Sequence, residues 1–252
     1  MIKVVLIGSG NVAFHLAKAF GQSESIDLVQ LFRRDPKNDS FFDQNIPKTD
    51  RIEHLEKADV YVIAIRDDQI AEFSKKLNVK DSLVVHTSGS IIMDQLKCDT
   101  PKGVFYPLQS FSTDQKIDYK AIPFCLETEF SNDMDLLKSL AYSISKNVYE
   151  INSIQREKLH IAAVFANNFS NYMFTIAKEI CDDHQISFDL LKPLILNTAN
   201  KVNQIDPKEA QTGPAKRNDN KIIQKHLNQL TGDQKDIYDL ISKSIINSYL
   251  KD

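Results

Sequence analysis

The chain has 252 residues, 42% hydrophobic and 26% charged, a composition typical of a globular protein with one large or two modest domains. Lysine and arginine number 31 and aspartate and glutamate 34, so the formal net charge is −3 and no global field favours nucleic acid. The three cysteines form no C-x-x-C pair, so we predict neither a metal site nor a disulfide framework. No apolar run approaches the roughly 20 residues that a membrane span needs, and no targeting segment is visible, so we expect a cytoplasmic protein.

The first twenty residues predict a strand, a glycine turn and a helix. Residues 2–7 form a strongly apolar, mostly β-branched run that contains one lysine, Lys3, and residues 11–20 follow at helical spacing. The turn between them reads G-x-G-x-x-A, which is the dinucleotide-binding fingerprint in the strand–turn–helix context that it needs. The helix start offers N–H groups and a positive dipole end to phosphates, although an ordinary strand-to-helix turn without a ligand is the alternative. The predicted pyrophosphate-binding residues are Gly8, Ser9, Gly10, Asn11, Val12 and Ala13.

The end of the second predicted strand, residues 26–32, carries Arg33 and Arg34. An NAD site places an acidic side chain about 20 residues beyond the fingerprint, where it binds the ribose hydroxyls. A guanidinium pairs with a phosphate instead, so the two arginines indicate a 2′-phosphate and therefore NADP(H), and they argue against a methyl-donor site. Two alternatives stay open: the arginines are solvated loop residues, or Asp35 takes the acidic role.

Strands alternate with helices to about residue 151, which predicts an α/β fold with a doubly wound, mostly parallel sheet. The further predicted strands are 59–65, 82–85, 103–105, 122–127 and 147–151; a loop is expected over 36–47, and helices over 51–57, 68–77 (capped by Asp67 or Asp68) and about 132–146. Ligands bind beyond the carboxyl ends of strands in such sheets. We therefore expect further cofactor contacts from Ile65, Arg66, Thr87, Ser88 and Gly89, with His86 beside them as a candidate catalytic residue or as a side chain turned into the structure.

The strand pattern stops after residue 151, so we predict two domains, 1–151 and an all-α domain over 152–252. Residues 153–183 lack proline and glycine and predict a helix about 45 Å long. Its middle, 159–180, is apolar on nearly all sides and needs cover that the remaining chain is too short to give, so we predict a homodimer through these helices. Further helices are expected over 187–204, with a kink at Pro193, and then after Asp219 and after residue 231, with a loop over 206–218.

Polar residues on the long helix are the second group of candidates for chemistry. Lys158, His160, Asn167, Asn168 and Asn171 recur at steps that place several of them on one face. Buried amides need partners, and these are either a substrate or the neighbouring helices. His160 or Lys158 is a candidate proton donor to a carbonyl or imine as a hydride arrives, and Asn168 is predicted to act beside them. Residues 212–217 form either a cationic loop that closes over an anionic substrate or a plain surface loop.

The chain resembles a family that joins a dinucleotide-binding Rossmann domain to a domain of unknown function. The resemblance rests on Gly8–Ala13, His86–Gly89, Tyr106–Phe111, His160–Phe169 and Thr212–Asp219, and it runs over nearly the whole length. The family is similar to ketopantoate reductase, pyrroline-carboxylate reductase and the hydroxyacid dehydrogenases. It implies an NADP-type Rossmann domain and a helical domain, similar to the C-terminal part of 6-phosphogluconate dehydrogenase, that dimerises. The family pattern often has a histidine where Tyr106 stands.

These observations predict an NADP(H)-dependent oxidoreductase that reduces a small carbonyl or imine compound, one that bears a carboxylate. The cofactor lies on Gly8–Ala13 and Arg33–Arg34, and the substrate lies between residues 86–89, Gln109 and the helix around 160–168. No motif for nucleotide hydrolysis, zinc peptidase or serine hydrolase chemistry is present. Two other hypotheses stay open: a dinucleotide-binding sensor or scaffold without turnover, and a structural dimer with an empty Rossmann fold.

Overall fold

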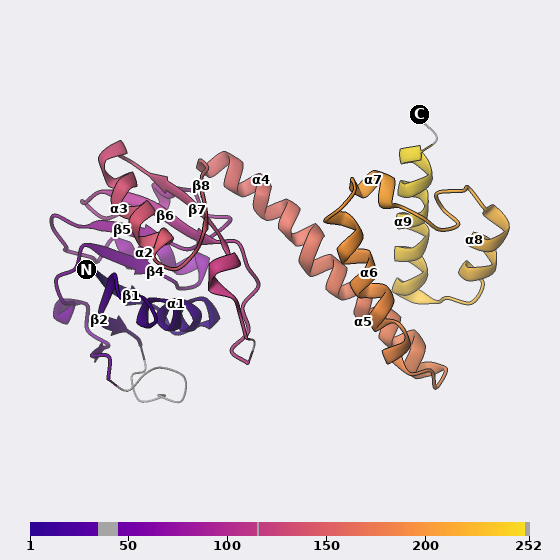
Figure 1. Cartoon of the computed structure of the whole chain (residues 1–252), viewed down its shortest axis with the longest axis horizontal. Coiled ribbons are helices and arrows are strands. Elements are labelled where there is room, and N and C mark those ends of the chain that lie inside the picture. Colours follow the sequence, from indigo (N-terminus) through magenta and orange to yellow (C-terminus); the bar gives the residue numbers. More distant parts are fainter. Residues whose placement is uncertain (35–44, 115, 250–252) are drawn as a thin grey trace. The chain divides into compact units, whose positions relative to one another are not determined.

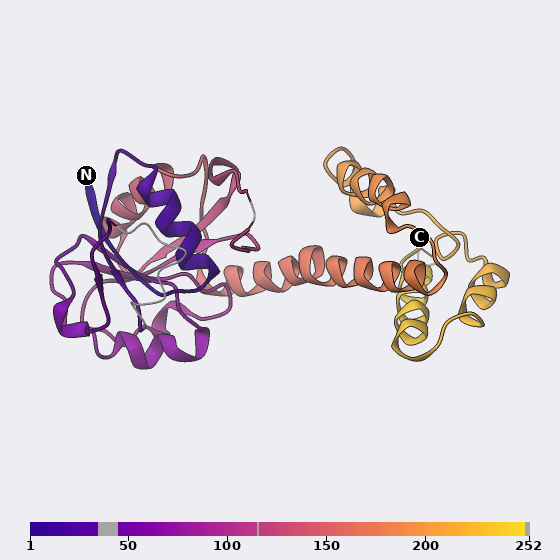
Figure 2. The same cartoon turned by 90° about the horizontal axis from the view of Figure 1, so that it is seen from below.

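The structure, a computed structural model, describes residues 1–34, 45–114 and 116–249. Contacts between residues divide the chain into two compact units, Met1–Asn168 and Phe169–Asp252 (Figures 1 and 2). The first unit holds the sheet and the second is helical. The domain boundary that the sequence places after residue 151 stays a prediction. Asp35 and most of the loop expected over 36–47 lie outside the described residues.

The first unit is built on one eight-stranded sheet, which confirms the α/β fold with a mostly parallel Rossmann sheet. All neighbouring strands are parallel except β6 and β7, which run antiparallel. The order β3-β2-β1-β4-β5-β6-β7-β8 reverses direction at β1, and at such a switch point the carboxyl ends of the strands open a crevice. The strands are β1 (Ile2–Ile7), β2 (Ile26–Phe32), β3 (Lys48–Thr49), β4 (Val60–Ile63), β5 (Leu83–His86), β6 (Lys102–Pro107), β7 (Pro123–Thr128) and β8 (Asn147–Glu150).

Both faces of the sheet are covered, which is why the central strands are apolar without alternation. In β1, Val4 and Leu6 pack on one face with α1 (Asn11–Gly21) and α3 (Ser131–Tyr142). Val5 and Ile7 of the same strand pack on the other face with α2 (Ile70–Ser74). Helices on both faces therefore make the sheet doubly wound, and its ligand-binding edge is the row of strand ends.

Several predicted helices are shorter than the pattern indicated. The helix expected over 51–57 is the single 3₁₀ turn η1 (Ile52–His54), and the one expected over 68–77 divides into η2 (Asp67–Gln69) and α2. Neither Asp67 nor Asp68 caps it: Asp67 accepts a hydrogen bond from the Ser90 hydroxyl, and Asp68 pairs with Arg66. These carboxylates meet tertiary partners that a local capping rule does not take into account.

The long predicted helix is present and contains a π turn. It consists of α4 (Ser153–Ala163), the π-helical turn η5 (Val164–Phe169) and α5 (Ser170–Asp183). The expected burial of its apolar middle is not found in the single chain: Phe165 is 65% exposed and Tyr172 48%. The sequence pattern therefore identified an apolar helix surface correctly, and side chains on that surface are exposed in the described part of this chain.

The second unit consists of α5 and the helices that follow it in the chain. The helices after α5 are η6 (Phe188–Leu190), α6 (Lys192–Val202), α7 (Pro207–Ala210), α8 (Asn220–Leu227) and α9 (Gly232–Tyr249). Pro193 does not kink a helix but stands in the first turn of α6, where a missing N–H costs nothing. The predicted Asp219 cap is confirmed, since its carboxylate accepts from the N–H of Ile222 at 3.2 Å. Helix α7 lies inside the expected loop. No helix among the described residues combines the length and the apolar character of a membrane span.

Candidate functional site

A cavity of about 750 Å³ lies at the carboxyl ends of β1, β2, β4 and β5. It brings together the segments that the sequence analysis predicted to meet there. The residues named as cofactor contacts that line it are Gly8, Ser9, Gly10, Asn11, Val12, Arg33, Arg34, Ile65, Arg66, Thr87, Ser88 and Gly89. Ala13 does not line it, because its methyl group is fully buried between the turn and the sheet.

The two glycines of the fingerprint meet different surroundings. Gly8 has φ +142°, and a Cβ there would lie 2.1 Å from the carbonyl oxygen of Ala64 and 3.3 Å from the Cβ of Ala13. Gly8 therefore lets the turn approach β4 and α1. A Cβ at Gly10 would meet no atom within 4 Å, so the space beside it is open. No side chain caps α1, and its first turn holds no acidic residue, so its N-terminus fits a diphosphate.

Arginines from two strand ends line one part of the cavity. Arg33 is buried and Arg34 is exposed, and the Arg34 guanidinium donates to the side-chain oxygen of Gln69 at 2.6 Å. Arg66, after β4, is also exposed and is paired with Asp68 at 3.0 Å. The arginines supply hydrogen-bond donors and positive charge to the cavity, which is the chemistry that binds a phosphate group.

The turn after β5 is held by its own side chains. His86 is fully buried, and its Nδ1 accepts from the N–H of Ser88 at 3.1 Å. Burial, with the positive charge of Arg156 as a second cause, lowers the pKa of His86 to about 3, so the imidazole is neutral with its proton on Nε2. The Ser88 hydroxyl accepts from the N–H groups of Ser90 and Ile91. The predicted His86 therefore holds the turn and does not line the cavity.

A loop between β6 and β7 forms a further part of the wall and is tied to α1. Asn11 donates from its side chain to the carbonyl of Phe111 at 2.9 Å. The buried His15 lies within hydrogen-bond distance of the Tyr119 hydroxyl and the Ser112 carbonyl, at 2.9 and 2.8 Å. These contacts place Phe111 at the cavity edge. Sequence reasoning missed His15, whose position on the apolar face of α1 was the available signal.

A second cavity, of about 510 Å³, lies between the loop after β6 and helix α4 with its π turn. Asn167 and Asn168 both line it from the π turn. A π turn is rare and marks functional positions more often than chance, and here it accompanies two consecutive amides on one cavity. Gln109 and His160 line both cavities, so the two spaces meet at these residues.

The residue where both cavities meet, His160, is paired with Tyr106. The Tyr106 hydroxyl and the His160 Nδ1 are 3.2 Å apart. A Cβ at Gly89 would lie 2.6 Å from that Nδ1 and 2.7 Å from the Tyr106 ring, so only glycine allows the pair to lie against this turn. Burial raises the pKa of Tyr106 to about 12, which keeps its hydroxyl protonated. Predicted Lys158, by contrast, is exposed and lines neither cavity.

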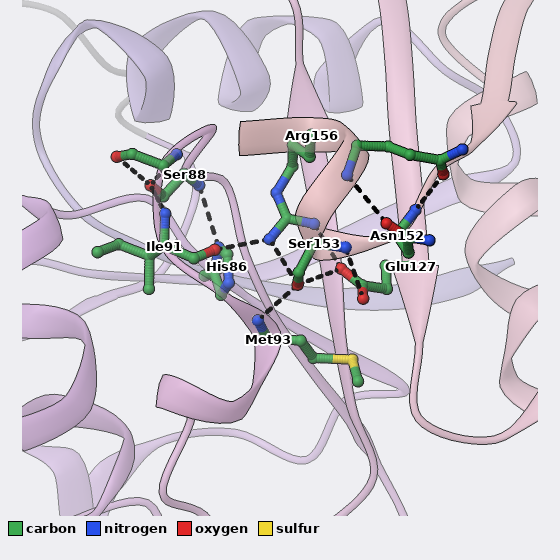
Figure 3. Close-up of polar contacts among 10 residues, drawn as sticks. His86, Ser88, Ile91, Met93, Glu127, Asn152, Ser153 and Arg156 are labelled. Atoms are coloured by element: carbon green, nitrogen blue, oxygen red, sulfur yellow. Dashed lines mark hydrogen bonds and ion pairs between the residues drawn. The ribbon is translucent and has the colours of Figure 1, made fainter. Parts of the chain in front are cut away.

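A buried ion pair fixes α4 to the sheet, and Figure 3 shows its contacts. Arg156, 1% exposed, donates to a carboxylate oxygen of Glu127 on β7 at 2.5 Å and to the carbonyl of Ile91 at 2.6 Å. Ser153 donates its N–H and hydroxyl to the same carboxylate at 2.9 and 2.7 Å. His160 stands one helical turn after Arg156, so this anchor determines where the His160 ring lies. The sequence analysis did not identify this pair.

The other candidates lie elsewhere. The loop of residues 212–217 belongs to the second compact unit. No group of three or more histidine, cysteine, aspartate or glutamate side chains that could hold a metal ion is found in residues 1–34, 45–114 and 116–249.

Known proteins resemble this chain in sequence and in structure. Residues 3–89 match the family profile described as NADP oxidoreductase, coenzyme F420-dependent, and residues 122–245 match a domain of unknown function, DUF2520. A solved structure from Bacteroides fragilis, designated an NADP oxidoreductase, is 37% identical over 98% of both chains with a TM-score of 0.89. A search of curated proteins finds no significant match.

Two more distant structures share the fold. Pyrroline carboxylate reductase from Plasmodium falciparum, solved with NADP bound, is 15% identical with a TM-score of 0.57, over 99% of this chain and 96% of that one. An imine reductase from Myxococcus stipitatus in complex with NADP⁺ is 14% identical with a TM-score of 0.62, over 99% and 93% of the chains.

Proposed function

This chain belongs to the family that joins an NADP-binding Rossmann domain of the NADP oxidoreductase type to a DUF2520 domain, and from this premise we propose that it is an NADPH-dependent reductase of a small C=N or C=O compound. The cofactor is NADP(H). The observation that carries the proposal is the meeting of two cavities at His160: one has a dinucleotide turn and arginines, and the other has two amides.

The residues of the chain have separate roles in this proposal. The turn Gly8–Ala13 holds the diphosphate, and Arg33 and Arg34 hold the 2′-phosphate. NADPH supplies a hydride when bound. The substrate lies in the second cavity, where Asn167, Asn168 and Gln109 can donate to a polar group, a carboxylate included. His160 gives a proton to the substrate heteroatom.

The test is a spectroscopic assay of NADPH oxidation against a panel of cyclic imines, keto acids and aldehydes, with and without a carboxylate, and with coenzyme F420 as a further acceptor. Saturable oxidation by at least one compound class supports the proposal. Tight NADPH binding without any turnover contradicts it and favours the sensor or scaffold.

Arg34 offers a direct check on the cofactor. We expect Arg34→Ser to weaken NADPH by about 10- to 100-fold, because a hydrogen bond to a charged group contributes about 1.5–3 kcal/mol. NADH, which lacks the 2′-phosphate, should bind equally to both forms. Fluorescence titration with the two nucleotides measures this. Lys18→Ser, in the last turn of α1, is the matched control for the loss of one positive charge. An equal loss for NADH would contradict the assignment.

We further propose a homodimer through the helical part of the chain. In the second unit, Leu190, Leu194 and Leu196 are 72%, 59% and 62% exposed, on η6 and α6. Apolar exposure on this scale is typical of an interface. Light scattering tests the proposal: a mass of twice 28.7 kDa supports it, and a single-chain mass contradicts it.

A further inference from the structure

The pairing of Tyr106 with His160 carries an inference that rests on the proposed function. We infer that Tyr106 is a positioning residue: its hydroxyl holds the Nδ1 proton of His160 and so makes Nε2 the atom that gives a proton to the substrate. The two ring nitrogens of a histidine are distinct, and the hydrogen bond at one decides which of them exchanges its proton.

The contacts around the pair support this assignment. The Tyr106 hydroxyl lies 3.2 Å from Nδ1, and the side chain is only 9% exposed. Among the hydrogen bonds of the described residues, none involves His160 Nε2, and the ring lines both cavities. Burial raises the pKa of Tyr106 to about 12, so the phenol keeps its proton. The two rings are arranged edge to face, with their centroids 6.2 Å apart.

The proton balance follows from the tautomer. His160 enters the step as the imidazolium, with Nδ1–H donated to the Tyr106 oxygen. The substrate carbon takes the hydride and both of its electrons from NADPH, and the C=N or C=O π electrons become a lone pair on nitrogen or oxygen. That atom takes the proton from Nε2. His160 leaves as the neutral imidazole with its remaining proton still on Nδ1.

Gly89 makes this arrangement possible. It leaves the space that a methyl group would take from Nδ1 and from the tyrosine ring. The other titratable or charged groups that act on Tyr106 are Cys125, Arg156 and Asp67. Of these, Arg156 is held by Glu127, and Asp67 accepts from the Ser90 hydroxyl. The hydroxyl is the group within hydrogen-bond distance of Nδ1.

The test is the tautomer of His160 in Tyr106→Phe, read by long-range ¹H–¹⁵N NMR, with His160→Gln to assign the signals among the six histidines. In the wild type we expect the neutral ring to carry its proton on Nδ1. We expect the proton on Nε2 in Tyr106→Phe. We expect the same in Gly89→Ala, whose added Cβ would lie 2.6 Å from Nδ1 and 2.7 Å from the tyrosine ring. An Nδ1 proton that persists in Tyr106→Phe overturns the inference.

Kinetics give the second readout. We expect Tyr106→Phe to lower kcat by about 10- to 100-fold, as the loss of an orienting partner does elsewhere, with the KM for NADPH unchanged. Tyr61→Phe, which removes another buried hydroxyl, is the control with unchanged kcat. Unchanged kcat in Tyr106→Phe overturns the inference. A wild type without turnover overturns the proposed function, while the tautomer still decides the role of Tyr106.

Discussion

Replacing Glu127 with alanine is expected to lower the free energy of unfolding by about 3–5 kcal/mol, since it leaves a buried guanidinium without its counter-charge. Arg156 is 1% exposed and the Glu127 side chain 15%. The carboxylate also accepts hydrogen bonds from the N–H and the hydroxyl of Ser153. The substitution therefore leaves three donor groups at the start of α4 without their acceptor. Urea unfolding measures the effect. Because the chain has no tryptophan, tyrosine fluorescence or circular dichroism serves as the signal.

Two control variants distinguish the loss of a buried charge partner from the loss of an ion pair in general. Asp182→Ala removes the exposed pair with Lys178, whose side chains are both 57% exposed, and should cost about 0.5 kcal/mol or less. The double variant Glu127→Leu with Arg156→Met should be more stable than Glu127→Ala, because no buried charge remains. A loss of less than about 1 kcal/mol in Glu127→Ala would refute the anchoring role.

The second large effect is expected at Gly8. Gly8→Ala should lower the free energy of unfolding by about 3–5 kcal/mol, because a left-handed-region φ and an overpacked contact each cost about 1–3 kcal/mol. The added methyl would lie 2.1 Å from the Ala64 carbonyl oxygen. Gly10→Ala, two residues away with open space around it, should cost about 1 kcal/mol or less. Thermal unfolding of the two variants compares them; equal stability would contradict the account of the turn.

Local pattern was enough to predict the sheet and the cofactor edge. Runs such as 4–7 and 60–63 are buried on both faces, so they are continuously apolar and easily recognised. The rule that ligands bind beyond the carboxyl ends of parallel strands then placed Gly8, Arg34 and Gly89 around one cavity without any coordinates. These features depend on periodicity and chain order, which a sequence displays directly.

What the sequence did not predict depends on long-range contacts. Glu127 and Arg156 are 29 residues apart, and neither has a neighbour in sequence that marks it as buried. Tyr106 and His160 are 54 apart, and their pairing needs Gly89 from a third segment. The π turn is equally hidden, since its residues continue the helical pattern. Charged or polar residues at strand ends and helix starts were the available signal, but they do not name their partners.

The exposed apolar surface of the long helix is a second feature that the sequence predicts only in part. The sequence predicted that residues 159–180 need cover, and the single chain leaves Phe165 and Tyr172 exposed. The pattern shows that this helix surface is apolar, but it does not identify what covers the surface.

The central claim is that the turn Gly8–Ala13 grips the diphosphate of NADPH, and calorimetric titration of the wild type and Gly10→Ala with NADPH tests it most directly. We predict that the wild type binds NADPH in preference to NADH, and that Gly10→Ala, folded to the same extent, binds it about tenfold or more weakly because the methyl group occupies the space of the phosphates. Equal NADPH binding by the two proteins, or none by the wild type, would contradict the account.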